Sequence, residues 1–434
     1  MSTELIGWLA IIIMLVLLFL RVHVAIVLAL VGFIGYWIVN DLTSALSIMG
    51  DTVFSVINNY NFSVVPLFLL MEFFDFYSGI VSQLFDTAKK WIGHMPGGLA
   101  QATILGGAGF AAVSGSGFAS TATLARTTIP EMIRSGVHPR LAYGVVASVG
   151  PLAQMIPPSI MMIMYAIIAE QPISSLLIGG ILPGILAALV YMVVVFTLVK
   201  RNPSLAPPVK RAPLKERVSS LKNTWSFMIL AFIIVGGIYS GTFTAAEAGA
   251  VSAFAALVLS IISGKFNLNV LKNSITQTIK TTSMVFLIVS CAFIFGYFLG
   301  ITRIPTEMSN FLVSLEVHRM VILIAIVIMF LILGMFMDML AVMFLTLPII
   351  LPSIIALGFD PIWFGVLIVF LAEVSLVTPP FGISLFIIKG TIPDSDLTDI
   401  IRGSIPFVVS DFVIIALLII FPEIITFLPD LMKQ

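Results

Sequence analysis

The sequence predicts an all-helical, polytopic membrane protein made of two repeats with opposite orientations in the membrane. Its composition excludes a soluble globule: 60% of the 434 residues are hydrophobic, 10% are charged and the mean hydropathy is +1.17, which leaves too few polar side chains to cover such a surface. Glycines and prolines recur 222 positions apart: Pro130, Gly136, Pro139 and Pro157-Pro158 return as Pro352, Gly358, Pro361 and Pro379-Pro380. Paired apolar units interrupted at the same place are typical of transporters that bind their cargo near the bilayer midplane.

The charges and the single cysteine narrow the function class further. Lys and Arg together number 21, as do Asp and Glu, so the balance gives no reason to expect a nucleic-acid partner. Cys291 is the only cysteine, which excludes an internal disulfide, and no ligand-spaced His or carboxylate lies near it. The first apolar run, 5–20, continues into a second one, so we expect a retained membrane helix and not a cleaved signal peptide.

Eight apolar segments are long enough to cross a bilayer, which takes roughly 17 to 25 residues. They lie near 4–20, 22–39, 61–80, 173–199, 224–240, 244–263, 281–300 and 404–428. Together with the two broken helices described below, they predict about ten crossings.

A basic linker at 200–223 fixes the predicted orientation. It carries seven Lys or Arg against one Glu, so the positive-inside rule places it in the cytoplasm. Counting crossings outward from it puts both termini of this multi-pass protein on the outer face of the membrane. The linker also separates the two repeats.

Two segments, 96–134 and 320–355, are predicted to be re-entrant hairpins that enter the membrane from opposite faces. The first turns at SGSG, 114–117, and the second near Gly334 and Met337-Asp338. Glycine permits a tight reversal, and serine hydroxyls can satisfy the backbone groups that the turn frees. Two ordinary spanning helices in place of each hairpin would keep the same parity, so that alternative stays open.

A broken helix follows each hairpin, at 139–170 and 361–389. Adjacent prolines remove backbone donors and leave carbonyls without helical partners. Such carbonyls are tolerated at membrane depth only inside protein or beside a wet cavity, and a sodium ion can bind several of them. A proline kink that only shapes packing is the alternative, and two kinks at one offset favour a site.

The predicted parts are 1–60, N-terminal scaffold helices; 61–200, first repeat; 201–280, linker, scaffold helices and connecting arm; and 281–428, second repeat.

Several polar residues inside these segments are candidates for function. The offset of 222 positions relates Gly150 to Ala372, Ala153 to Ser375 and Ile156 to Thr378. Further candidates are the hairpin positions Ser114, Ser116, Gly334 and Asp338. Intramembrane carboxylates cost roughly 2.5 to 3.5 kcal/mol each on insertion scales, which makes Asp338 and Glu373 functional candidates. For Glu72, Asp75 and Asp411 a structural explanation is at least as good as a functional one. Each carboxyl could pair within the protein or with a partner subunit, or could extend to the membrane interface. Arg126 either meets an anionic substrate or anchors the cytoplasmic edge.

No catalytic signature is present, so we expect a protein that is not an enzyme. The sequence has no P-loop, dinucleotide-binding fingerprint or G-x-S-x-G elbow. An intramembrane hydrolase with Ser116 as nucleophile would lack a histidine at membrane depth. A passive channel suits reversed hairpins less well than alternating access does.

The motifs, taken in order, resemble the large membrane subunit (DctM-like permease) of tripartite ATP-independent periplasmic (TRAP) transporters, over nearly the whole chain. In the first half these are GGLA 97–100, SGSG 114–117, IPEM 129–132, HPRLA 138–142, IPPS 156–159 and GILPG 180–184. In the second half they are LGMFMD 333–338, LPI 347–349, DPIWFG 360–365 and TPPFG 378–382.

The resemblance implies a sodium-coupled secondary importer of a small organic acid such as a dicarboxylate, a keto acid or a sugar acid like sialic acid. It implies two partners, a periplasmic substrate-binding protein and a small four-helix membrane subunit, here a separate chain. It also implies an ion-transporter-superfamily fold and an elevator movement. A stand-alone sodium-coupled carboxylate carrier or a sodium/proton antiporter of the same fold is the alternative, and neither would need a binding protein.

The resemblance also distributes the candidates among sites. The first sodium site would use Ser114, Ser116, Gly150, Ala153 and Ile156, and the second would use Gly334, Asp338, Ala372, Ser375 and Thr378. The organic acid would lie between the hairpin tips, near Ser116, Gly117, Thr121, Arg126, Pro158, Met337 and Pro380. The family often reads Ser-Gly-Ser-Ser at the first tip, whereas this chain has Gly117 and then Phe118, which argues against the commonest substrates.

Overall fold

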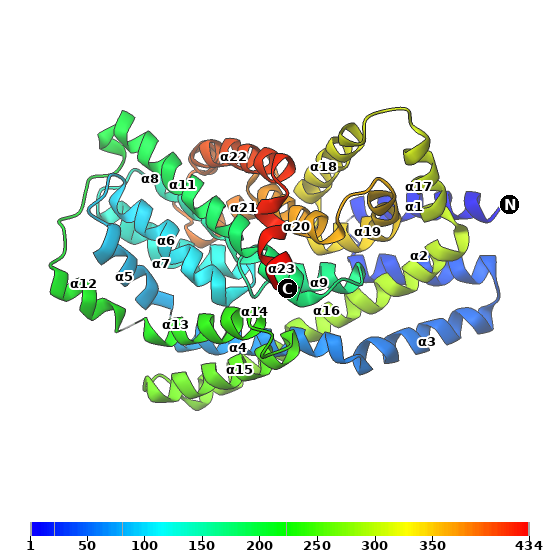
Figure 1. The fold of residues 1–434 in the computed structure, drawn as a ribbon, viewed down its shortest axis with the longest axis horizontal. Helices are drawn as coiled ribbons and strands as arrows, with labels where there is room; N and C mark the ends of the chain where they lie inside the picture. Colours follow the sequence, from blue (N-terminus) through cyan, green and yellow to red (C-terminus); the bar gives the residue numbers. More distant parts are fainter. Residues whose placement is uncertain (1, 21, 80, 223, 433–434) are drawn as a thin grey trace.

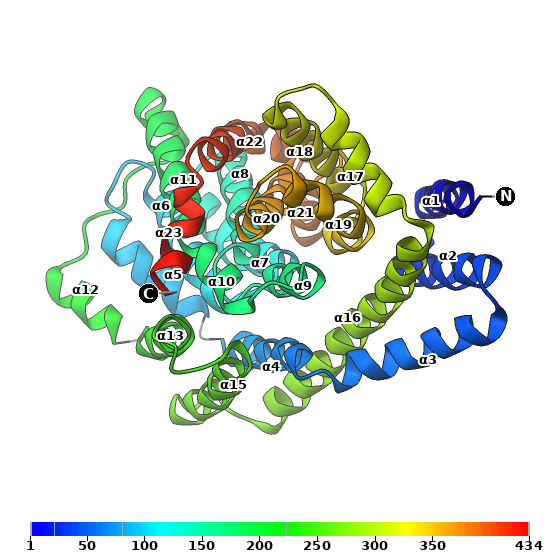
Figure 2. The same cartoon turned by 45° about the vertical axis from the view of Figure 1, so that its right-hand side comes forward.

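The computed structural model describes residues 2–20, 22–79, 81–222 and 224–432, and within these ranges every regular element is a helix (Figure 1). One group of helices forms a layer along one side of the molecule. This layer contains α2 (Val24–Val39), α3 (Leu42–Asn58), α4 (Val64–Ser78), α15 (Ala245–Ile262) and α16 (Leu268–Thr302). Helix α4 packs between α15 and α16, and α16 packs along α2 (Figure 2).

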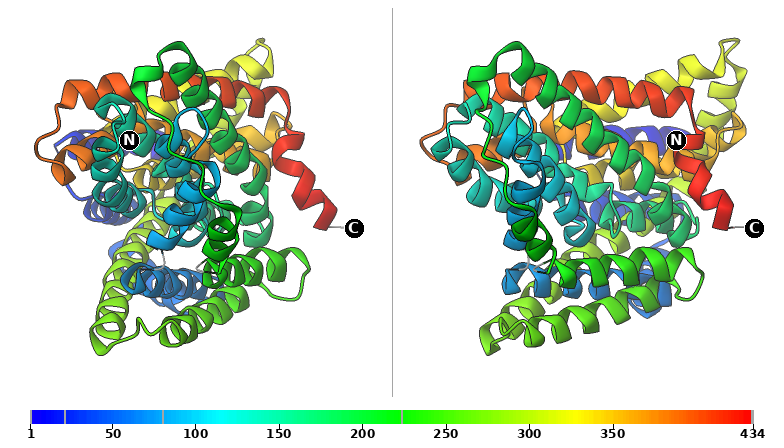
Figure 3. Two further views of the ribbon diagram at one scale, coloured as in Figure 1. Left: turned by 90° about the vertical axis from the view of Figure 1, so that its left-hand side faces the viewer. Right: turned by 60° about the vertical axis from the view of Figure 1, so that its left-hand side comes forward.

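Most of the remaining helices form a bundle beside this layer, and the side views show both parts (Figure 3). The first half supplies α5 (Val81–Ile92), α6 (Gly98–Ser114), α7 (Gly117–Arg134), α8 (Pro139–Val149), a 3-10 turn (Pro151–Gln154), α9 (Ile160–Ile168), α10 (Ile173–Gly179) and α11 (Ile181–Arg201). The second half supplies α17 (Ile304–Ser314), α18 (Arg319–Phe336), α19 (Met339–Ala356), α20 (Pro361–Val377), α21 (Ile383–Thr391), α22 (Leu397–Ile420) and α23 (Glu423–Met432).

Local chemistry fixes where the key helices begin. Asp360 caps α20, because its carboxylate accepts the amide hydrogen of Trp363 at 2.7 Å, and Pro361 occupies the first helical position. Ser116 caps α7 by accepting from the Ala119 amide. Asp338 caps α19 in the same way, through the Leu340 amide at 3.0 Å. The residues that end each turn therefore also start the next helix.

The helix bounds repeat at the offset found in the sequence. Shifted by 222 positions, α7 (Gly117–Arg134) covers 339–356, the bounds of α19, and α6 (Gly98–Ser114) covers 320–336, one residue from α18. Helix α5 shifts onto α17 with the same one-residue difference. Helices α6 and α7 are joined by a turn at 115–116, and α18 and α19 by a turn at 337–338. Whether these pairs are re-entrant hairpins stays a prediction. Their opposite membrane orientation stays a prediction.

Both predicted helix breaks are present. The first interrupts the chain between Val149 and Ile160, where one 3-10 turn stands between α8 and α9. The second lies between Val377 and Ile383. The Pro157-Pro158 and Pro379-Pro380 peptide bonds are both cis.

The number of helices that could cross a membrane differs from the sequence estimate of about ten crossings. Among the described residues, six helices are long and apolar enough, or up to eight if two bent pairs each count as one span. Helices α1 (Thr3–Phe19) and α2 have 17 and 16 residues and fall just short. The separate pieces of the broken helices have between 9 and 17 residues, so none of them qualifies alone.

Three helix bounds also differ from the predicted segments. Helix α3 was not predicted, and it meets the helix that follows it at 57°. Helix α16 runs unbroken for 35 residues, so the predicted 281–300 span and its connecting arm are one helix. The apolar stretch at 404–428 is divided at Pro422, where α22 ends and α23 begins, because proline lacks the amide that would continue the helix.

Candidate functional site

Each hairpin packs against the broken helix of its own half and also against the broken helix of the other half. The second arm of the first hairpin, α7, packs on the 3-10 turn of its own half and on α21 of the other half. The second arm of the second hairpin, α19, packs on α20 of its own half and on α9 of the other. Turns and breaks from both repeats are thereby gathered into one region of the bundle.

The first hairpin tip touches the first helix break at Gly115. This glycine has φ +62°, and a Cβ there would lie 2.7 Å from the Pro158 carbonyl oxygen and 3.8 Å from Oε2 of Glu72. Only a residue without a side chain allows such an approach. Ser114, the residue before it, donates its hydroxyl to Oε1 of Glu72 at 3.0 Å.

Gly150 and Thr121 hold the hairpin against the beginning of the break. A Cβ at Gly150 would lie 2.1 Å from Thr121 Oγ1, so Gly150 serves close packing on α7. Thr121 is fully buried and donates to the Gly117 carbonyl at 2.7 Å. The position predicted to bind substrate is therefore enclosed between α7 and the break.

Gln154 is a polar residue at this contact that sequence reasoning missed. Its Nε2 would lie 3.0 Å from a Cβ at Gly117, and its buried Oε1 has no hydrogen-bond partner among the described residues. In the sequence, the signal for Gln154 was an amide side chain inside a mostly apolar break. Ser159, another such residue, donates to the Gln154 carbonyl and caps α9 by accepting from the Met162 amide at 3.2 Å.

The other two members of the predicted first sodium set are less favourably placed as side chains. Ala153 is fully buried within the 3-10 turn. The Ile156 side chain points to α11, where its Cγ1 would lie 2.6 Å from a Cβ at Gly184. Any contribution of Ile156 to a cation would therefore come from its backbone.

The second hairpin approaches α20 at Gly334. A Cβ at Gly334 would lie 2.6 Å from Ser375 Oγ. The hydroxyls of Ser375 and Thr378 donate to the helix carbonyls of Ala372 at 2.8 Å and of Val374 at 2.6 Å. Because their protons are engaged inside the helix, their oxygen lone pairs stay available to a cation.

The remaining predicted substrate residues differ in exposure. Pro158 is buried, Ser116 and Met337 are half-buried, and Arg126 and Pro380 are exposed. Arg126 has no ion pair or hydrogen bond within the described part of the chain. Their contact with an organic acid stays a prediction.

Two buried carboxyls meet at one tyrosine away from the tips. Tyr191 of α11 donates to Asp411 Oδ1 of α22 at 2.6 Å and lies 3.2 Å from Glu373 Oε1 of α20. All three side chains are fully buried. For Asp411 this supports pairing within the protein, one of the two explanations that the sequence left open.

Tyr191→Phe should therefore lower the stability of the purified protein in detergent. The change leaves a buried carboxyl without its donor, which costs about 1 to 3 kcal/mol. Tyr165→Phe is the matched control, because this fully buried hydroxyl donates to a neutral acceptor, the Pro361 carbonyl, at 2.7 Å. A thermal-unfolding series should show the larger loss for Tyr191→Phe, and equal losses would contradict a role for the carboxyls.

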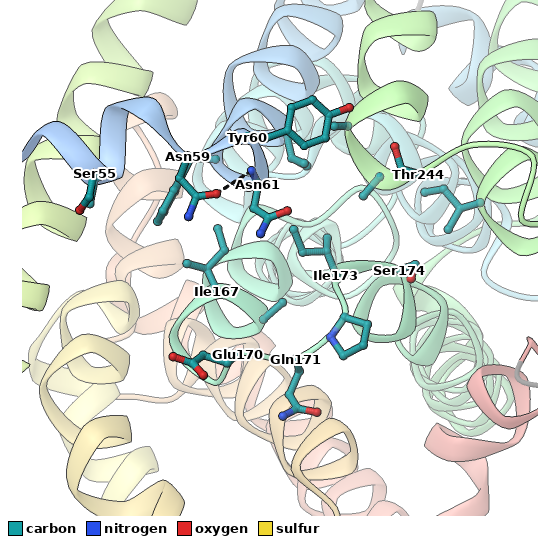
Figure 4. Close-up of a pocket in the computed structure, with 18 of the residues that line it drawn as sticks. Ser55, Asn59, Tyr60, Asn61, Ile167, Glu170, Gln171, Ile173, Ser174 and Thr244 are labelled. Carbon is teal, nitrogen blue, oxygen red and sulfur yellow. Dashed lines mark hydrogen bonds between the residues drawn. The ribbon is translucent and has the colours of Figure 1, made fainter. Parts of the chain in front are cut away.

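A cavity of about 830 Å³ lies between the helix layer and the bundle (Figure 4). It is bordered by the segment before α4, the segment after α9 and the start of α15, and its polar lining includes Asn59, Asn61, Glu170, Gln171 and Thr244. The count of crossings from the sequence assigns all three segments to the periplasmic face. The cavity is thus a candidate entrance between the two parts.

The donor set of the site suits a hard monovalent cation. Within the described residues, no three His, Cys, Asp or Glu side chains come together as they would around a transition metal. Hydroxyl oxygens and carbonyls at breaks gather instead, and discontinuous helices in transporters coordinate sodium with such groups.

Comparisons with known proteins agree on one family. Residues 11–424 match the family model described as "Tripartite ATP-independent periplasmic transporter, DctM component". The chain is 34% identical over 378 residues to a C4-dicarboxylate TRAP transporter large permease of Pseudomonas aeruginosa, covering 87% of this chain and 86% of the relative. It is 30% identical to the sialic acid large permease of Vibrio cholerae (86% and 87% covered). It is 32% identical to the 2,3-diketo-L-gulonate large permease of Escherichia coli (89% of each).

Two solved transporters share the fold. The YdaH transporter of Alcanivorax borkumensis superposes with a TM-score of 0.63 at 13% identity, covering 88% of this chain and 89% of its own. MtrF of Neisseria gonorrhoeae, described as belonging to a class of antimetabolite efflux pumps, gives 0.62 at 15% identity, with 87% and 85% covered. At these identities the likeness concerns the fold alone.

Proposed function

Because the chain belongs to the DctM-component family of tripartite ATP-independent periplasmic (TRAP) transporters, we propose that it is the large permease of a sodium-coupled importer of a small organic acid. The observation that carries this proposal is the meeting of two hairpin tips with two broken helices. Gly115 approaches the Pro158 carbonyl, and Gly334 approaches the Ser375 hydroxyl.

The proposed complex has three components and lies in the bacterial inner membrane, with both termini of this chain in the periplasm. A small four-helix membrane subunit would pack beside this chain, and a periplasmic binding protein would deliver the substrate. The named relatives handle C4-dicarboxylates, sialic acid and a diketogulonate. All of these are carboxylates, which supports an organic acid as the substrate here.

The chain's own residues would hold sodium and substrate at the two contacts. Ser114 and Ser116 with the backbone around Gly150 would form one sodium site, and Ser375 and Thr378 with Gly334 the other. Bound sodium would contribute the free energy of its gradient and offset the negative charge of the acid. The hairpins and broken helices would then move as one elevator body against the layer of α4, α15 and α16.

The experiment that tests this proposal is uptake into vesicles that contain this chain and its small subunit. We expect accumulation of an organic acid only with an inward sodium gradient and with the cognate binding protein outside. Uptake without the binding protein would favour the stand-alone carrier. Proton release in exchange for sodium, without acid uptake, would favour the antiporter. A thermal-shift screen of the binding protein against organic acids identifies the substrate to use.

Ser116→Ala and Asp338→Ala should each weaken sodium-driven uptake in these vesicles. Ser116 caps α7 and Asp338 caps α19, so each substitution removes an oxygen at a hairpin tip and also an N-cap. Loss of the N-cap lowers the stability by about 1 kcal/mol. We expect the sodium concentration for half-maximal uptake to rise about tenfold, the scale found for groups that support metal ligands. Ser314→Ala is the control, because this hydroxyl donates only to the Phe311 carbonyl in the last turn of α17, at 2.8 Å. Unchanged uptake for both tip variants would remove them from the site.

A further inference from the structure

Two carboxyl groups lie buried on α4, one of them at the first hairpin tip, and nothing in the family assignment explains them. Glu72 is 5% exposed and Asp75 is 1% exposed. They are three positions apart on one helix, a spacing that places side chains on the same face. Two buried carboxyls three positions apart on one helix of a membrane protein need a compensating partner.

Among the described residues, only one of the four carboxyl oxygens has a hydrogen-bond partner. Glu72 Oε1 accepts from Ser114 at 3.0 Å, and Ser114 Oγ accepts in turn from Ser120 Oγ at 2.8 Å. Both oxygens of Asp75 are buried with no hydrogen-bond partner among the described residues. A fully buried carboxyl with two orphaned oxygens points to a ligand that is absent from a protein-only structure.

Within the described residues, no basic side chain pairs with Glu72 or Asp75. The two ion pairs found there join Lys89 to Glu131 and Arg140 to Asp399. The Lys265 ammonium donates to the Gly79 carbonyl, just past the end of α4, at 3.2 Å. Neither Glu72 nor Asp75 is therefore neutralised by a described lysine, arginine or histidine.

Further oxygen donors converge on the same place. The Glu72 carboxyl faces Gly115, whose missing side chain leaves the tip 2.7 Å from the Pro158 carbonyl, measured from an ideal Cβ position. The Ser114 and Ser120 hydroxyls complete a set of carboxylate, hydroxyl and carbonyl oxygens. Oxygen ligands of this kind suit a hard cation, and the sodium coupling proposed above makes sodium the candidate.

We propose that Glu72 and Asp75, with the Ser114 and Ser120 hydroxyls, form an acidic binding site for one monovalent cation beside the first hairpin tip. The inference rests on the proposed sodium coupling and deepens it, because the oxygens predicted for the first sodium site carry no formal charge. The cation would join α4 of the helix layer to the hairpin of the bundle. Its release would leave two unneutralised carboxyls on α4, with Glu72 facing the tip, which favours separation of the two parts.

Glu72→Gln and Asp75→Asn test this proposal, because each removes charge and keeps shape and an acceptor oxygen. The readout is the melting temperature of the purified transporter complex during titration with NaCl at constant ionic strength, with choline chloride as the balance. We expect sodium to stabilise the wild type, and the concentration giving half of that effect to rise about tenfold or more in either variant. In choline alone, Asp75→Asn should melt higher than the wild type, because an orphaned buried charge is gone.

Asp411→Asn is the matched control, since Asp411 is equally buried but is bonded to Tyr191 on another helix. It should keep the wild-type response to sodium. Ser120→Ala covers the case in which a carboxyl variant does not fold, and it should also weaken the sodium response. Unchanged sodium midpoints in the variants that fold, or stabilisation by CaCl2 in place of NaCl, would overturn the site.

The outcomes also separate this inference from the proposed function. If neither the melting temperature nor the uptake of the wild type depends on sodium, sodium coupling itself is refuted. A wild type that responds to sodium, beside Glu72→Gln and Asp75→Asn proteins that respond identically, would refute only the acidic site.

Discussion

Gly115→Ala should abolish organic-acid uptake in vesicles while the protein still inserts and folds. Gly115 has φ +62° at the first hairpin tip, a conformation that costs a residue with a side chain about 1 to 2 kcal/mol. The larger effect is steric, because the new methyl group would stand 2.7 Å from the Pro158 carbonyl oxygen. Relief requires the tip to withdraw from the break, which separates the groups proposed to bind sodium.

Gly264→Ala isolates the steric effect from the backbone strain. Gly264 has φ +67°, close to the φ of Gly115, and nothing lies within 4 Å of its Cβ position. Both variants should lose a similar amount of stability from strain, and only Gly115→Ala should lose uptake. Equal uptake by the two proteins would show that the contact between tip and break has no role in transport.

Gly334→Ala should have a comparable effect at the second hairpin, and this contact can be repaired. The new Cβ would stand 2.6 Å from Ser375 Oγ and 2.9 Å from Ser375 Cβ, so both of the closest contacts are with one side chain. Overpacking of this kind costs about 1 to 3 kcal/mol. The single variant should melt lower and transport poorly.

The double variant Gly334→Ala/Ser375→Gly separates packing from cation binding. It removes both close contacts, so its melting temperature should return toward the wild-type value. If the Ser375 oxygen binds sodium, uptake should stay weak and need more sodium. Gly296→Ala, at a helical position with nothing within 4 Å, is the control. Full recovery of uptake in the double variant would exclude Ser375 from the site.

Much of the fold could be predicted because this chain marks its irregularities with glycine and proline. The turns at 115–116 and 337–338 and the breaks at Pro157-Pro158 and Pro379-Pro380 are found where the sequence placed them. Proline cannot donate to a helix and glycine alone allows the positive φ of Gly115, so these signals are local. The mixed polar and apolar composition of α3 gave no comparable signal.

The site was predicted less completely because its contacts join residues far apart in the chain. Ser114 meets Glu72 across 42 positions, and Tyr191 meets Asp411 across 220. No spacing rule connects such pairs. The repeat offset also placed Ile156 in the first sodium site, as the counterpart of Thr378. In the structure, the Ile156 side chain packs toward Gly184.

Accessibility labelling of two equivalent positions tests most directly whether the two halves have opposite orientations. Arg134 ends α7, Ala356 ends α19, and both are exposed. Single cysteines at these positions, in a background with Cys291→Ala, would be treated with a membrane-impermeant maleimide in spheroplasts and in inverted vesicles. We predict labelling at 134 only from the cytoplasmic face and at 356 only from the periplasmic face. Labelling of both positions from the same face would contradict inverted repeats and the transport mechanism proposed from them.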